Sequence, residues 1–507
     1  MYQNWQYEVD PKDPLKPLYQ GTFEEKVTVG GKQRRYLVYI PKNARPSTAG
    51  VFILPENGKT ADDLWRDSWW RMIADTEETK EKLFVFFLAP ENGAWNSEEP
   101  YGKADGDVAY VEQVYLAGAQ RFKFCVHEAK FYLTGAREGG VIANMAAMFN
   151  PAVWAGAATV GGSKVPEDYR KAAADDYCTN LDGFVDESHR LNLKKSDIPM
   201  PAWVIDDPES PVGTDNGTAD YWKHSCGITE DGVQTAPDTV TYVRTTEPPY
   251  APNQEKEAFR VCTSTISGGS ADYANLLLRR IWKDFLYRQR RWMSGPGGDL
   301  RVTKDPVADL GMEYHYEEIG GWMREWYVYV PEQVKQNPGK PVPLVFAMHG
   351  YTCSAEIYCG NSEWYKVADK YGFILVHPTA TPGTMDATTV ASSPDNVALP
   401  AWNFMRKAPN GPDELVFFRT LLDRVCAEHT IDRTRIYATG HSHGSIMTQV
   451  LAMSMPEVFA AAAPCSGVIF KGFGMDIRET PEFRNRKDCP IPVWMFGGEQ
   501  EPWLLDS

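Results

Sequence analysis

The 507-residue sequence lacks several features that would mark particular classes of protein. Its nine cysteines form no C-x-x-C pair, and their odd number argues against both a zinc ribbon and a disulfide framework. No stretch approaches the roughly 18 uninterrupted apolar residues of a membrane-spanning helix. The beginning of the chain has neither a basic start nor an apolar core, so it does not resemble a signal peptide. The cytoplasm is therefore the expected location.

Positive charge is also in deficit. Fifty-two basic residues face 68 acidic ones, which gives a formal net charge of −16. This balance disfavours nucleic acid and anionic membranes as partners and suits an enzyme that handles small, neutral or modestly charged molecules. No His, Cys and carboxylate residues occur at metal-ligand spacing, so neither a metal nor an organic cofactor is expected. The oligomeric state is left open, a homo-oligomer included.

The most informative stretch is the pentapeptide Gly440 to Gly444, GHSHG, which fits G-x-S-x-G. A short apolar strand is predicted before it, and after it apolar residues recur at helical spacing until Pro456. Strand, tight turn and helix form a nucleophile elbow, in which Ser442 stands exposed at the tip. The two glycines are needed because the strained turn leaves no room for a Cβ.

The two halves of the chain share four landmarks in the same order, which indicates a duplicated fold. The first-half segments are 36–41, 51–54, 131–139 and 199–203, and they match 326–331, 345–348, 436–444 and 490–494. Strands alternate with helical stretches in both halves, which is typical of parallel α/β units. The sequence therefore predicts two α/β domains with mostly parallel sheets flanked by helices.

Domain boundaries follow from composition. We predict a first domain over residues 1–294, a linker over 295–308 and a second domain over 309–507, because a Gly/Pro-rich stretch breaks the chain near 294–298. Residues 207–252 are expected to form a long loop or cap, and residues 271–292 an amphipathic closing helix. In the second half, Pro412 and Asp413 mark the start of a helix over residues 411–429.

The halves differ at the positions that carry chemistry. The serine position of the elbow is Arg137 in the first half, and His349-Gly350 of the second half is replaced by Pro55-Glu56. The first half therefore cannot form the same acyl-enzyme. We expect it to be a degenerate copy that serves as a scaffold or partner domain.

Residues 313–507 resemble the α/β-hydrolase esterases of the poly(3-hydroxybutyrate) depolymerase and feruloyl esterase type. The matching segments are 345–350 (VFAMHG), Ser354-Ala355, Trp402-Asn403, 411–414 (GPDE) and 439–444 (TGHSHG). The resemblance implies that Ser442 attacks an ester carbonyl. It also implies that the backbone of His443, with that of Gly350 or Tyr351 in the loop that includes His349, holds the oxyanion.

The resemblance further implies an acid that orients the base. Glu501, which precedes a proline, is the first candidate and Glu499 the second. No histidine follows His443, although this fold places the catalytic histidine last. His377, at a strand end, remains a candidate for lining the site.

Compared with the first half of the chain, the second copy is short at its C-terminal end. About 90 residues follow the 199–203 landmark, against 13 after Trp494, so a last strand, the histidine loop and a closing helix are expected to be missing from it. A truncated chain is favoured over a natural end. The leading hypothesis is a serine carboxylic ester hydrolase acting on small soluble or aryl/hydroxyacyl esters. A serine peptidase of the prolyl-oligopeptidase type and a non-catalytic binding or scaffold protein are the alternatives.

Overall fold

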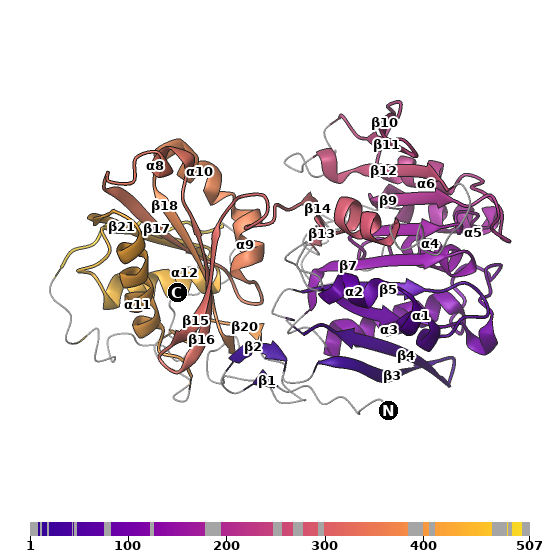
Figure 1. Cartoon of the computed structure of the whole chain (residues 1–507), viewed down its shortest axis with the longest axis horizontal. Helices are drawn as coiled ribbons and strands as arrows, with labels where there is room; N and C mark the ends of the chain where they lie inside the picture. Colours follow the sequence, from indigo (N-terminus) through magenta and orange to yellow (C-terminus); the bar gives the residue numbers. More distant parts are fainter. Residues whose placement is uncertain are drawn as a thin grey trace. The chain divides into compact units, whose positions relative to one another are not determined.

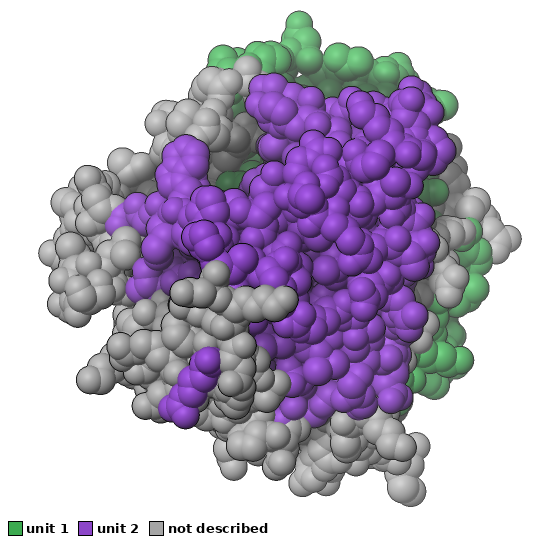
Figure 2. Space-filling model, turned by 90° about the vertical axis from the view of Figure 1, so that its left-hand side faces the viewer, with its two compact units in different colours: residues 1–6, 20–44, 48–303 green, residues 7–19, 45–47, 304–507 purple. Residues whose placement is uncertain are grey.

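The computed structural model of the chain (Figure 1) divides into two compact units, coloured separately in Figure 2. Unit 1 comprises residues 1–6, 20–44 and 48–303, and unit 2 comprises residues 7–19, 45–47 and 304–507. The predicted linker, 295–308, spans the division between 303 and 304. The structure describes the following residues: 9–10, 13–17, 20–42, 44, 48–75, 83–121, 126–177, 194–246, 256–266, 277–292, 299–383, 399–404, 411–468, 484 and 489–498.

The described strands of unit 1 form a ten-stranded sheet in the order β10-β11-β12-β9-β8-β7-β5-β6-β4-β3. The central run from β12 to β6 is parallel and both edges are antiparallel. The strands are β3 (Gly21–Val29), β4 (Lys32–Ile40), β5 (Thr48–Leu54), β6 (Leu83–Phe87), β7 (Val126–Ala136), β8 (Gly156–Val160), β9 (Ala202–Asp206), β10 (Val233–Ala236), β11 (Thr239–Val243) and β12 (Arg260–Thr265). Every residue of β5 is buried, as expected for a central strand of a parallel sheet.

Helices cover both faces of the unit 1 sheet. Inward-facing residues such as Val51 and Ile53 pack in one core cluster with residues of α1, α2 and the helical residues 277–286. On the opposite face, Phe52 packs against Trp154, and α4 packs against β7 and β8. The helices are α1 (Ala61–Asp67), α2 (Trp70–Asp75), η1 (Glu91–Gly93), α3 (Asp107–Arg121), α4 (Glu138–Phe149), α5 (Glu167–Asp175), η3 (Lys195–Asp197), α6 (Thr218–Ser225), η4 (Lys256–Ala258) and η5 (Ile281–Leu286).

Two predictions for unit 1 are wrong. The predicted loop or cap at 207–252 contains helix α6 and the antiparallel pair β10 and β11, which extends the sheet from β12. The predicted closing helix ends early, because Gln289–Trp292 forms strand β13, which pairs with β14 (Asp299–Val302). Its last turns, η5, are a π-helix, and its predicted start at 271–276 lies outside the described residues. Between these two regions, residues 260–265 form strand β12.

Unit 2 contains a six-stranded sheet in the order β15-β16-β18-β17-β21-β22. The run from β18 to β22 is parallel, while β15 and β16 are antiparallel to their neighbours. The strands of this sheet are β15 (Glu313–Ile319), β16 (Trp322–Tyr329), β17 (Val342–Met348), β18 (Ile374–Thr379), β21 (Ile431–His441) and β22 (Ala461–Cys465). Two short antiparallel pairs accompany it: β1 (Val9–Asp10) with β2 (Asp13–Pro17), and β19 (Pro382–Gly383) with β20 (Leu399–Pro400).

The unit 2 sheet also carries helices on both faces. On one face, Val345 and Leu375 pack with residues of α9 and α10. On the other face, Phe346 and Val376 pack with residues of α11 and α12. The helices are α8 (Glu332–Lys335), α9 (Ala355–Ser362), α10 (Trp364–Tyr371), α11 (Glu414–Glu428) and α12 (His443–Ser454). The helix predicted at 411–429 is confirmed as α11, with Asp413 as its N-cap.

The four repeated landmarks occupy equivalent positions in the two sheets. The order β4-β6-β5-β7-β8-β9 of unit 1 is matched in unit 2 by β16-β18-β17-β21-β22, followed by an extended segment at residues 493–496. This segment bridges to β22 in parallel, through Ala462 to Val493 and Cys465 to Phe496. The α/β fold with mostly parallel sheets is therefore as predicted.

Among the described residues, no helix is both long enough and apolar enough to cross a membrane. The seven described cysteines are free thiols: Cys226, Cys262, Cys353, Cys359, Cys426, Cys465 and Cys489.

Candidate active site

Ser442 occupies the sharp turn between β21 and α12. Its backbone angles are φ 52° and ψ −115°, a region that a residue with a Cβ adopts only at a cost of about 1–3 kcal/mol. The Ser442 N–H donates to the Cys465 carbonyl, 2.9 Å away at the end of the neighbouring strand β22. The elbow is therefore held by the sheet itself, and it presents the serine at the N-terminus of a buried helix.

The glycines on either side of Ser442 are required by close packing. A Cβ on Gly440 would overlap the carbonyl oxygen of Gly444, one turn further on. A Cβ on Gly444 would overlap the carbonyl oxygen of Met348 and lie 2.6 Å from that of His349. The steric reason given for the G-x-S-x-G pattern thus applies at both positions.

The loop after β17 lies directly against the elbow. A Cβ on Gly350 would stand 3.3 Å from the Cβ of Ser442 and 3.4 Å from Nδ1 of His441. Glycine is the residue that allows this approach of the loop backbone to the serine. The structure therefore brings Gly350, Ser442 and His443 together, with Tyr351 following Gly350 and its ring 5.8 Å from that of His443.

Trp402 ties this loop to the helix that follows the serine. Its backbone N–H donates to Nδ1 of His443 at 3.0 Å, and its indole N–H donates to the carbonyl of His349 at 2.9 Å. The His443 ring is buried and also packs on Phe404, 4.5 Å between ring centroids. Because its Nδ1 accepts a hydrogen bond, neutral His443 carries its proton on Nε2.

His349 stabilises the same loop from inside. Its Nε2 accepts the Ala380 N–H at 2.9 Å, so its Nδ1 carries the proton and donates to the Gly350 carbonyl at 2.7 Å. Burial lowers the pKa of His349 to about 3, against the influence of the hydrogen bond to Gly350. A neutral ring with both nitrogens bonded to backbone holds the Gly350 loop in place.

His377 lies in β18 with a fully buried ring. Its Nδ1 bonds to the Ala347 carbonyl at 3.1 Å, and burial lowers its pKa to about 4. Among the described residues, its Nε2 has no hydrogen-bond partner. Within the same part of the chain, no side chain is hydrogen-bonded to Ser442 Oγ. The general base is thus not revealed by the geometry.

The two candidate acids, Glu501 and Glu499, lie outside the described residues. Glu414 is a described carboxylate that is hydrogen-bonded to the segment containing Trp402. It accepts the Asn403 N–H at 3.1 Å and pairs with Arg324 at 2.8 Å, with both charged side chains almost fully buried. This pair anchors the Trp402-Asn403 motif rather than the serine.

The structure also assembles a group that the sequence spacing did not indicate. Ligand atoms of Glu313, Glu428 and His429 lie within 4.8 Å of one another. The two carboxylates are exposed, and the group joins β15 to the end of α11, elements that carry none of the elbow residues. Exposed groups of this kind are common without a metal.

Unit 1 contains an elbow of the same backbone geometry without the serine. Arg137 has φ 49° and ψ −121°, and its N–H donates to the Val160 carbonyl at 2.8 Å, as that of Ser442 does to Cys465. Its guanidinium pairs with Glu56 at 2.6 Å. Glu56, which stands at the position of Gly350, is thus a charged residue, and Arg137 of the elbow neutralises its charge.

Sequence reasoning missed the roles of Trp402 and Glu414 as tethers. Trp402 is 53 residues from His349 and 41 from His443, so no local pattern connects them. The only available signal was the Trp-Asn motif itself.

A serine at a strained strand-to-helix turn, facing a glycine loop at the end of a parallel strand, defines the class of α/β-hydrolases. Residues 327–484 match the profile of the family described as Esterase PHB depolymerase. Over these residues, unit 2 is therefore similar to the α/β-hydrolase esterases of the poly(3-hydroxybutyrate) depolymerase and feruloyl esterase type.

Individual relatives are similar to part of the chain. Feruloyl esterase B of Talaromyces stipitatus is 34% identical over 148 residues, covering 29% of this chain and 36% of the relative. The probable acetylxylan esterase A of Aspergillus fumigatus is 32% identical over 177 residues, covering 34% and 42%. The chain thus spans less than half the length of these curated relatives. Among solved structures, a thermostable esterase matches with 23% identity and a TM-score of 0.27, covering 38% of this chain and 47% of that one.

Proposed function

We propose that this protein is a serine carboxylic ester hydrolase that acts through an acyl-enzyme on small soluble or aryl/hydroxyacyl esters. The observation that carries the proposal is the contact between the Ser442 elbow and the Gly350 loop. Ser442 is a nucleophilic residue held in a strained turn, and the Gly350 backbone lies close beside it because Gly350 has no Cβ. Acyl transfer needs such an arrangement of a nucleophile beside an accessible backbone. The esterase relatives of unit 2 support the same class of reaction.

In this mechanism Ser442 Oγ attacks the ester carbonyl carbon as its proton passes to a general base. The oxyanion of the tetrahedral intermediate accepts hydrogen bonds from the backbone N–H of His443 and that of Tyr351 or Gly350. Each such donor contributes about 3 kcal/mol to the transition state. The alcohol leaves with the proton from the base, and water then releases the acid from Ser442 by the same steps.

In the proposed mechanism His349 has a positioning role. His349 fixes the carbonyl of Gly350 and so orients the donors of the loop, since both its ring nitrogens are bonded to backbone. Glu501, with Glu499 as second candidate, orients the base. A small ester, in place of an extracellular polymer, and a cytoplasmic location belong to the same proposal.

The test is labelling with a fluorophosphonate probe, together with hydrolysis of p-nitrophenyl acetate. The parent chain, Ser442→Ala and Ser454→Ala are compared; Ser454 ends the same helix and serves as the matched control. We expect one label, located at Ser442 by mass spectrometry, in the parent and in Ser454→Ala. Turnover in Ser442→Ala should fall by about a thousandfold or more.

A non-catalytic binding or scaffold protein is the second candidate. It is favoured by one observation, that no described residue is hydrogen-bonded to Ser442 Oγ. Absence of both label and turnover in a folded parent chain would support this alternative and reject the hydrolase.

A further inference from the structure

Unit 1 contains a cavity at the carboxyl ends of its central strands. The volume is about 310 Å³, and the floor includes Ile53 of β5, Ala136 of β7 and Val160 of β8. In α/β sheets this edge is where ligands bind. The cavity begins at the residue before the Arg137 elbow, so the elbow helps to shape it although it carries no nucleophile.

The walls of the cavity are apolar. Leu64 and Trp70, from α1 and α2, form one side, and Leu277 and Leu278 form the other. A volume of this size, lined mainly by aliphatic and aromatic side chains, is typical of a site for a small organic ligand. The apolar body of such a ligand would be removed from water by the strand ends and the two helical walls.

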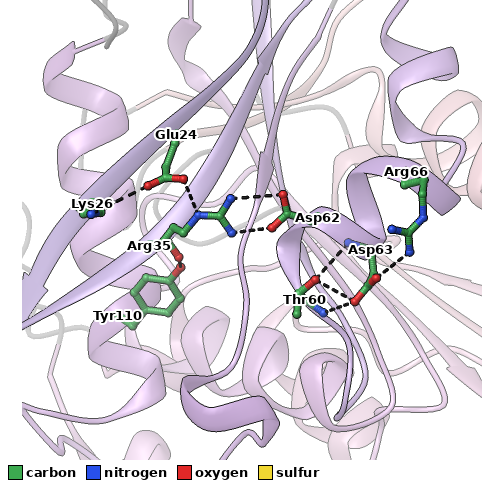
Figure 3. Close-up of polar contacts among 8 residues, drawn as sticks. All are labelled: Glu24, Lys26, Arg35, Thr60, Asp62, Asp63, Arg66 and Tyr110. Carbon is green, nitrogen blue, oxygen red and sulfur yellow. Dashed lines mark hydrogen bonds and ion pairs between the residues drawn. The ribbon is translucent and has the colours of Figure 1, made fainter. Parts of the chain in front are cut away.

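The carboxylates at the mouth of the cavity are already paired. The Asp63 carboxylate accepts the backbone N–H of Thr60, the N-cap of α1, and pairs with Arg66 at 2.6 Å, as Figure 3 shows. Asp67 pairs with the same arginine at 2.8 Å, and Glu56 pairs with Arg137 at 2.6 Å. The acidic side chains that line the mouth are thus engaged by cations of the protein itself.

Lys59 is the exception among these charges. It lines the cavity, and its ammonium forms neither a hydrogen bond nor an ion pair with any described residue. Arg66 and Arg137 already pair with the three carboxylates, so Lys59 is the cation of the lining that is available to pair with an incoming group. An anion on the ligand is therefore the charge that the mouth accommodates.

We propose that this cavity binds a small monocarboxylate with an aryl or short alkyl body, whose carboxylate pairs with Lys59 while its body fills the space between Leu64 and Val160. Ester hydrolysis at Ser442 releases acids of this class; only that link rests on the proposed function. Unit 1 thus has a binding role that does not depend on a nucleophile.

The experiment is isothermal titration calorimetry with cinnamate, and with cinnamamide as its neutral counterpart. The protein is the full chain carrying Ser442→Ala, so that binding is measured without hydrolysis. Three further substitutions are compared in this background: Lys59→Met, Leu64→Trp, and Lys32→Met as the matched control. Lys32 is an exposed lysine of unit 1 that already pairs with Glu91. Circular dichroism checks that each variant is folded.

We expect cinnamate to bind the parent and Lys32→Met equally, and cinnamamide to bind the parent about fivefold more weakly, as for an exposed ion pair. In Lys59→Met, cinnamate and cinnamamide should bind with equal affinity, because the carboxylate of cinnamate no longer has an ammonium with which to pair. Leu64→Trp should abolish binding of both. Lys59→Met is a surface change, so the test remains decisive if Leu64→Trp does not fold.

Three results would overturn the proposal: no binding of cinnamate at millimolar concentration, equal binding of cinnamate and cinnamamide to the parent, or cinnamate binding unchanged in Lys59→Met. All three are measured on a chain without Ser442 Oγ, so they are independent of whether the protein hydrolyses esters.

Discussion

The two elbows have nearly the same backbone but different chemistry. Arg137 and Ser442 differ by 3° in φ (49° and 52°) and 6° in ψ (−121° and −115°), and each donates its N–H to the end of the next strand. What differs is the side chain at the tip and the loop it faces, Glu56 in unit 1 and Gly350 in unit 2. The strands and glycines therefore set the strained turn. The chemistry that each elbow can perform depends on two positions, the residue at the tip and the loop residue that it faces.

The sheets differ at the strand beyond the elbow. Trp203 of β9 is 3% exposed, packs on Phe285 and donates its indole N–H to Ser264 of β12. The equivalent residue of unit 2, Trp494, is 71% exposed among the described residues. The same residue type thus contributes to a core in one unit and to surface in the other.

The largest expected effect comes from truncating these two tryptophans. Trp203→Ala should lower the free energy of unfolding by about 3–5 kcal/mol, because it opens a cavity and removes the indole hydrogen bond to Ser264. Trp494→Ala should change it by less than about 1 kcal/mol. Urea unfolding, with hydrogen exchange to assign each transition to a unit, measures both. A large loss in Trp494→Ala would show that this side chain is covered.

A smaller effect is expected at the elbow glycines. Gly139→Ala and Gly444→Ala each place a Cβ on carbonyl oxygens of the preceding central strand, so each should destabilise its own unit by about 1–3 kcal/mol. Gly339→Ala, where no atom lies within 4 Å of the new Cβ, is the control. If only Gly444→Ala were destabilising, the two elbows would not share one packing requirement.

Acid should weaken unit 2 through its buried histidines. The pKa values of His349 and His377 are lowered by burial to about 3 and about 4, from 6.5. Below pH 6.5 the unfolded chain binds protons that the folded chain does not, so stability falls as the pH falls toward 4. Each histidine contributes about 1.4 kcal/mol per pH unit in that window.

His377→Gln keeps a hydrogen-bond donor for the Ala347 carbonyl. It should reduce the slope of the unfolding free energy against pH, measured by urea unfolding, by about 1.4 kcal/mol per pH unit. His224→Gln, at an exposed side chain of unit 1, is the control and should leave the slope unchanged. An unaltered slope in His377→Gln would mean that His377 is protonated in the folded protein.

The smallest effect is expected for Arg137→Ser, which restores a serine to the first elbow. The Arg137–Glu56 pair is partly exposed, so its loss should cost no more than about 1 kcal/mol. No fluorophosphonate label is expected at residue 137, because Glu56 stands where unit 2 has Gly350. A label there would show that the serine alone is sufficient.

The sequence predicted the features that depend on local pattern. The glycines of GHSHG, the apolar run of β17 and the Asp413 cap each indicate their element from neighbouring residues. The hairpin of β10 and β11 was missed because its strands are short and mostly not buried, and sheet edges are stabilised by pairing rather than by apolar periodicity.

The site was predictable to a similar extent. Ser442 and Gly350 carry steric signatures in the sequence, and the structure brings them into contact. The bonds of His349 and Trp402 could not be predicted, because hydrogen-bond partners 31 to 53 residues apart leave no periodic signal. The acids Glu501 and Glu499 remain predictions.

Trp402 also links the loop after β17 to the start of α12. One residue is bonded through its main chain to the first residue of α12 and through its indole to the end of β17, so neither can shift without breaking a hydrogen bond or carrying the other along. In the proposed mechanism, this arrangement restrains the two backbone donors before an ester binds. Under the proposed mechanism, the free energy of orienting these donors is consequently spent during folding and not at the moment of reaction.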